Sequence, residues 1–119
     1  MSEDNEKTID AVMITALGNI ANVRINGLRD MQRAVGGMVE AIDVGIGDKE
    51  CTIWLNEEGK IWSLPSNTLA TDLAEGRIFA GDYIAGDVLI TGGVDDEGET
   101  LGVHPDVAGS LMYEKDRRG

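Results

Sequence analysis

Short apolar runs divided by glycine-containing turns constrain the fold of this chain more than any other feature. Sixteen of its 119 residues are glycine, about twice the usual share of ~7%, and most lie at the ends of apolar runs rather than in one flexible tract. This pattern predicts tight turns between short elements. The length is that of one domain, and with two Trp, two Tyr and one Phe the core must be mostly aliphatic.

Six runs are predicted to be β-strands because they alternate apolar and polar residues, or are apolar throughout and bounded by turn residues. We expect these strands at 9–15, 20–25, 38–44, 51–55, 60–64 and 88–91. The first two form a hairpin across a turn containing Gly18. The turn Asn56-Glu57-Glu58-Gly59 joins the fourth to the fifth in a second hairpin, with Gly59 suited to a left-handed conformation.

The first helix is predicted from a capping residue and a 3.6-residue period. Asn26 is suited to cap it, and Leu28, Met31 and Val35 share one of its faces. The glycine pair at 36–37 ends it.

Two more helices are predicted in the second half of the chain. Asn67 is suited to cap a short middle helix in which Leu69 and Leu73 face inward, with a loop as the alternative. Pro105 suits the first turn of a C-terminal helix with Leu111 facing the core. The order of elements predicts an α+β fold with a largely antiparallel sheet, one early helix, this short middle helix and a C-terminal helix.

One domain with two short tails is expected. Residues 1–8 read as a disordered acidic tail, 9–115 as a single α+β domain and 116–119 as a frayed tail. The acidic N-terminus is unlike a secretory leader, and no apolar run approaches the ~18 residues of a membrane span. Because the single cysteine excludes an internal disulfide, we expect a cytoplasmic protein.

The formal net charge is −12, from 22 acidic and 10 basic residues. This charge disfavours direct binding to nucleic acid or to an anionic membrane. Three interpretations remain open. The acidic surface keeps a small protein soluble, adapts it to high salt, or is offered to a basic partner as a nucleic-acid mimic would offer it.

The side chains available for catalysis are few, with one histidine and one cysteine. His104 precedes Pro105 at a helix start, which favours a capping or surface role. Cys51 lies on the apolar face of a strand, which favours a buried and inert thiol. The acidic segment 92–100 lacks the spacing of a calcium loop and is predicted to be a solvated turn. We expect no enzymatic activity, no cofactor and no metal site.

Three arginines run against the overall charge. Arg29 and Arg33 lie four residues apart on the first predicted helix, and Arg24 ends the strand before it. Such guanidinium groups can clamp a phosphate or a carboxylate, whereas pairing with the protein's own carboxylates is the alternative. Trp54 and Trp62 lie on the two arms of the second predicted hairpin. There they either pack in the core or form a stacking platform for a flat ligand.

Several motifs occur in an informative order. They are Met31-Gln32 with Val35-Gly36-Gly37 and Glu40, then Asn56-Glu57-Glu58-Gly59-Lys60, Leu64-Pro65-Ser66-Asn67 and the run 86–92. On these motifs the chain resembles a family of small domains of unknown function found in phages and actinobacteria, from about residue 9 to residue 103. It departs from the family in its acidic N-terminal extension and from His104 onward. The resemblance implies an origin in mobile genomes and no catalytic residue to carry over. The polar positions of the family pattern form a candidate site: Gln32, Glu40, Asn56, Glu57 and Asn67.

We therefore expect a non-catalytic accessory binding protein of phage or mobile-element type, which sequesters a small anionic or nucleotide-derived host signal in the host cytoplasm. Its expected ligand-binding residues are Arg24, Arg29, Gln32, Arg33, Glu40, Trp54, Asn56, Glu57 and Asn67. The alternative is an acidic inhibitor that competes for a basic or nucleic-acid-binding host protein. A homo-oligomer is expected because subunit interfaces create pockets that one small domain lacks.

Overall fold

Five antiparallel strands form one sheet with the most buried strand at its centre. The computed structural model describes residues 8–118. The strands are β1 (Thr8–Ile14), β2 (Ile20–Asn26), β3 (Val39–Ile46), β4 (Lys49–Asn56) and β5 (Val88–Gly92). Their order across the sheet is β2-β1-β5-β4-β3. Every residue of β5 is buried, because the strand pairs with β1 on one side and β4 on the other.

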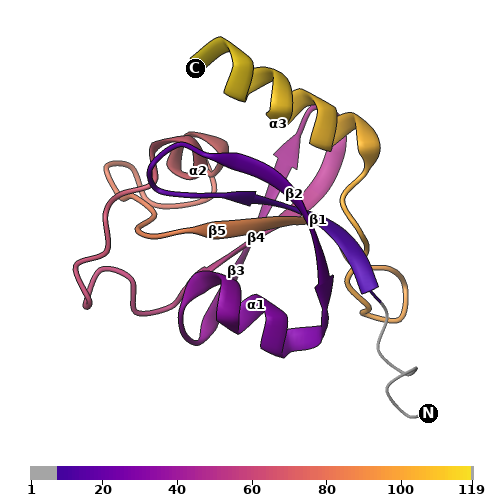
Figure 1. Ribbon diagram of the computed structural model, residues 1–119, viewed down its shortest axis with the longest axis horizontal. Coiled ribbons are helices and arrows are strands. Elements are labelled where there is room, and N and C mark those ends of the chain that lie inside the picture. The colour runs from indigo at the N-terminus through magenta and orange to yellow at the C-terminus, as the bar shows by residue number, and fades with distance from the viewer. Residues whose placement is uncertain (1–7, 119) are drawn as a thin grey trace.

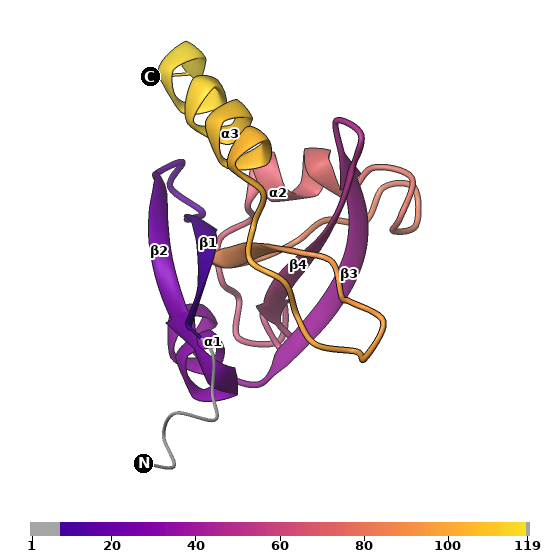
Figure 2. The same cartoon turned by 90° about the vertical axis from the view of Figure 1, so that its right-hand side faces the viewer.

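Helices cover both faces of the sheet and make a three-layered domain (Figure 1). Helix α1 (Gly27–Val35) lies on one face, and α2 (Thr68–Leu73) and α3 (Pro105–Arg118) lie on the other. Figure 2 shows the same layers from the side, with α1 below the sheet and α2 and α3 above it. The α+β prediction is confirmed.

The sheet separates two apolar cores, because successive side chains of a strand point to opposite faces. In the larger core Val12, Ile53 and Ile90 pack with Leu69 of α2 and Leu111 of α3. The smaller core lies under α1 and contains Ala11, Ile25, Met31 and Leu89. Aliphatic side chains thus provide nearly all of the buried surface.

Several local predictions are confirmed by the structure. The strands β1 and β2 form the expected hairpin, and Gly36 ends α1 in a left-handed conformation with φ 85°. Asn67 caps α2, because its side-chain oxygen accepts a hydrogen bond from the N–H of Ala70 at 3.1 Å. His104 caps α3 in the same way, with Nδ1 accepting from the N–H of Asp106 at 3.0 Å.

The second predicted hairpin is wrong, because residues 57–63 form a series of turns and no strand follows at 60–64. Strand β4 is an interior strand whose two edges are already filled by β3 and β5. A returning strand at 60–64 would have no edge to pair with. The hairpin partner of β4 is instead β3, joined to it through Gly47, which has φ 63°.

The start of α1 also differs from its prediction. The side chain of Asn26 makes no capping hydrogen bond. Its backbone N–H instead donates to the carboxylate of Asp30 at 2.8 Å. Leu28 is 55% exposed while Met31 and Val35 are buried, so Leu28 does not share the buried face of α1 with them as predicted.

The described residues begin at Thr8, which is already the first residue of β1; the rest of the predicted N-terminal tail lies outside them. The helical backbone of α3 continues to Arg118, past the predicted domain end at residue 115. Within residues 8–118, no helix has both the length and the apolar character needed to cross a membrane.

Candidate functional site

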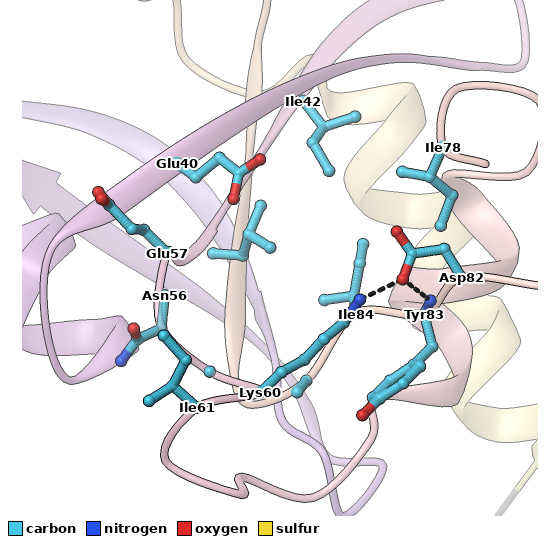
Figure 3. Close-up of a pocket in the computed structure, with 13 residues that line it drawn as sticks. Glu40, Ile42, Asn56, Glu57, Lys60, Ile61, Ile78, Asp82, Tyr83 and Ile84 are labelled. Carbon is cyan, nitrogen blue, oxygen red and sulfur yellow. Dashed lines mark hydrogen bonds and ion pairs between the residues drawn. The ribbon is translucent and has the colours of Figure 1, made fainter.

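A cavity of about 300 Å³ opens between the sheet and two loops (Figure 3). We call it the Lys60 cavity. Strand β3 contributes Glu40 and Ile42, and the end of β4 contributes Leu55. The rest of the wall comes from Asn56 with the 57–63 loop and from the 78–85 loop. Glu40, Ile42 and Leu55 lie on the α2 side of the sheet, since Ile42 and Leu55 belong to the larger core.

An ion pair joins the two loops across this cavity. Lys60 Nζ donates a hydrogen bond to Asp82 Oδ1 and lies 4.6 Å from the centre of the Tyr83 ring, within the range of a cation–π contact. The hydrogen bond to Asp82 raises the pKa of Lys60, and the negative charges of Asp82 and Glu40 raise it further. Hydrogen bonds from Lys60 and from the backbone N–H of Tyr83 lower the pKa of Asp82. Both groups are therefore charged at neutral pH.

The lining of the Lys60 cavity carries excess negative charge over an apolar floor. Its charged side chains are three carboxylates, from Glu40, Glu57 and Asp82, and one ammonium, from Lys60, which pairs with Asp82. The floor is aliphatic and includes Ile42. Carboxylates beside apolar walls suit a group that is both cationic and partly hydrophobic, such as a Lys or Arg side chain.

Gly59 allows the two loops to approach each other. A Cβ at this position would lie 2.7 Å from the carbonyl oxygen of Ala85, a separation that real Cβ atoms do not tolerate. Its φ is not positive, so the predicted left-handed conformation is wrong and close approach explains the glycine. The carbonyl of Gly59 also accepts a hydrogen bond from the N–H of Leu64 at 2.9 Å, which closes the 57–63 loop.

Three of the sequence-predicted site residues come together in this cavity: Glu40, Asn56 and Glu57. The Asn56 side chain is also committed to the fold. It donates to the carbonyl of Val35 at 3.2 Å and accepts from the N–H of Glu58 at 2.8 Å, so it fastens the end of α1 to the 57–63 loop.

The predicted basic patch does not form one surface. Arg24 lies on β2 next to Ile25, which packs under α1, so strand alternation turns Arg24 to the opposite face from the α1 residues Arg29 and Arg33. Arg24 pairs with Asp10 at 3.5 Å. Arg33 pairs with Asp30 at 3.1 Å, one turn away on α1.

The remaining predicted residues have packing roles in the structure. Gln32 donates to the sulfur of Met38 at 3.7 Å near the surface. Trp54 packs in the smaller core, on the opposite side of the sheet from the Lys60 cavity, and its indole N–H donates to Thr91 Oγ1 at 2.9 Å. Asn67 is buried at the N-terminus of α2. These positions are separate from the cavity.

Sequence reasoning missed Lys60, Asp82 and Tyr83 as site residues. Lys60 falls in the predicted strand at 60–64. Their ion pair spans 22 positions of the chain, and no local pattern encodes a contact of that range. The only available signal was Lys60 itself, at the end of the Asn56–Lys60 motif.

No curated protein and no solved structure matches this chain. A family model described as a domain of unknown function, DUF3846, matches residues 8–116. The match includes most of α3, so the expected departure from the family at His104 is wrong, and the terminal helix is part of the family domain. Since the match covers nearly the whole chain, this protein belongs to the DUF3846 family.

Proposed function

We propose that this protein is a non-catalytic binding protein that receives a positively charged side chain of a basic partner protein in the Lys60 cavity. The observation that carries the proposal is the charge of the lining, whose carboxylates are those of Glu40, Glu57 and Asp82 and whose one ammonium is that of Lys60. That ammonium already pairs with Asp82. Entry of a cation therefore lowers the electrostatic repulsion among the carboxylates, whereas entry of an anion raises it.

The overall charge supports the same choice of partner. At −12 the whole molecule attracts basic surfaces over long range and accelerates their encounter. Close contacts in the cavity then supply specificity. This corresponds to the alternative expected from sequence, an acidic inhibitor that competes for a basic or nucleic-acid-binding host protein.

An anionic or nucleotide-derived ligand has weaker support in the geometry. Arg24 and Arg33 each pair with a carboxylate, and Arg24 and α1 lie on opposite faces of the sheet. No arginine is among the described residues that line the Lys60 cavity. A phosphate there would lie beside three carboxylates, so we favour the cationic partner.

Support for a binding role rather than catalysis comes from the chemistry of the lining. Among the described residues that line the Lys60 cavity there is no Ser, Thr, Cys or His, so this lining does not supply a Ser, Thr or Cys nucleophile paired with a histidine base. The buried Cys51 lies on β4 in the larger core, and burial raises the pKa of its thiol, which disfavours the reactive thiolate. An accessory role in a phage or mobile element, acting in the host cytoplasm, is part of this proposal.

The proposal predicts that removing cavity carboxylates weakens binding more than removing carboxylates elsewhere. The double variant Glu40→Gln and Glu57→Gln is expected to bind a fluorescent nona-arginine peptide about tenfold more weakly than the unmodified protein. Fluorescence anisotropy at low and at physiological salt measures the affinity. The difference should persist at higher salt, because contacts in a partly enclosed cavity are screened less than surface charges.

The matched control removes the same two charges from the turn at 94–100. Asp96→Asn with Glu97→Gln changes the net charge equally, and neither side chain lines the cavity. This control should weaken binding about twofold or less, through the long-range field alone. Equal weakening by both double variants would show that the peptide senses only net charge, and would overturn the proposed site.

A further inference from the structure

A second, larger cavity adjoins the Lys60 cavity. Its volume is about 590 Å³, and its walls are the end of α2 with Glu75 and Gly76 and the segment 78–82. We call it the Phe79 cavity. Ile78 and Asp82 line both cavities, so the two hollows share one wall and lie side by side.

The Phe79 cavity has the same chemical character as its neighbour. Its carboxylates come from Asp72, Glu75 and Asp82, and no Lys or Arg is among the described residues that line it. Apolar surface is provided by Ile78 and by Phe79. A cationic, partly apolar group suits this hollow for the same physical reasons as it suits the Lys60 cavity.

Large apolar side chains are exposed on the two loops that bound these cavities. Phe79 is 87% exposed, Ile61 75% and Trp62 67%, and Tyr83 is also exposed. The loops carrying them are held together by the Lys60–Asp82 ion pair. Aromatic residues are enriched in the cores of protein–protein interfaces.

We infer that the two cavities form one docking surface for an extended basic segment of another protein, which places a Lys or Arg side chain in each cavity. The inference rests on the proposed function of the Lys60 cavity and adds the form of the partner. Charge complementarity selects a basic segment, since the combined lining has five carboxylates, with Asp82 shared, and one ammonium. The exposed aromatic side chains select a polypeptide over a free amine, because they contact the apolar stems and neighbours of its basic residues.

The test compares peptides with one and with two arginines in an otherwise neutral Gly/Ser sequence. The two-arginine peptides carry one, two or three residues between the arginines, and affinities are measured by NMR titration of the ¹⁵N-labelled full chain. At the best spacing we expect a gain of about tenfold or more over the one-arginine peptide, because the second contact becomes intramolecular. Glu75→Gln should abolish most of that gain in affinity. Asp96→Asn, which removes one charge from the 94–100 turn, should leave the gain unchanged.

The outcomes separate the two proposals. If one-arginine and two-arginine peptides bind within about twofold of each other at every spacing, the docking surface is overturned and the single cationic site stands. If free arginine amide binds as tightly as the two-arginine peptides, the ligand is a small cation and the inference of a polypeptide partner fails. If none of the peptides binds, the proposed function itself is overturned.

Discussion

Replacing Asn67 with alanine is expected to lower the free energy of unfolding by about 3–5 kcal/mol. The side chain is 1% exposed and makes three hydrogen bonds. Its amide donates to the carbonyls of Ile14 at 3.0 Å and Gly86 at 2.9 Å, and its oxygen accepts from the N–H of Ala70 at 3.1 Å. Alanine would leave these backbone groups buried without a partner, and each such group costs about 1–3 kcal/mol, less than additively.

The effect of this substitution is large because Asn67 joins three parts of the fold that are distant in sequence. It connects the end of β1, the start of α2 and the segment leading into β5. The control is Asn22→Ala on the exposed edge strand β2, which should change stability by less than about 0.5 kcal/mol. Urea unfolding followed by circular dichroism measures both variants. A loss below about 1 kcal/mol for Asn67→Ala would mean that the hydrogen bonds of this junction are not formed in solution.

Replacing Gly92 with alanine is expected to cost about 2–4 kcal/mol. A Cβ at Gly92 would lie 2.4 Å from the carbonyl oxygen of Gly102 and 3.2 Å from that of Leu101. Both obstacles are backbone atoms and cannot rotate away. Relief of the clash would shift residues 101–103 and weaken two hydrogen bonds, from the N–H of Gly92 to Leu101 at 3.0 Å and from the N–H of Val103 to Asp10 at 2.8 Å.

The counterpart to Gly92 is Gly109 on α3, where an added Cβ meets no atom within 4 Å. Gly109→Ala should stabilise the protein by about 0.5–1 kcal/mol, because alanine has the higher helix propensity. The same urea unfolding experiment compares the two glycine variants. Equal stability of Gly92→Ala and the unmodified protein would contradict the close approach of residues 101–102 to the centre of the sheet.

Elements defined by local chemistry could be predicted from the sequence. The β1–β2 hairpin, α1, α2 and the start of α3 each carry their own signal, in apolar period, in a cap such as Asn67 or in a stop such as Gly36. The hairpin expected at 56–64 failed although its turn residues were favourable. Turn chemistry says nothing of whether the edge of a neighbouring strand is free, and β3 and β5 already occupy both edges of β4.

The candidate site was predicted only in part. Glu40 and Glu57 were selected on a family resemblance, and they lie in the same cavity. The other two charged residues of the cavity, Lys60 and Asp82, pair with each other across two loops. This contact depends on the close approach of the loops at Gly59 rather than on any local pattern. The three predicted arginines do not share one surface for a similar reason. Helix spacing brings Arg29 and Arg33 together on α1, but the alternation of side chains along β2 turns Arg24 to the other face of the sheet.

The central claim is that the Lys60 cavity receives a cationic side chain, and amide chemical-shift mapping tests it most directly. The ¹⁵N-labelled full chain is titrated with an arginine-containing Gly/Ser peptide, and shifts are followed at every backbone amide. We expect saturable changes concentrated in the 57–63 and 78–85 loops and around Glu40, with small changes at the acidic 94–100 turn. Changes concentrated at the 94–100 turn or on α1, with the two loops unaffected, would contradict the claim.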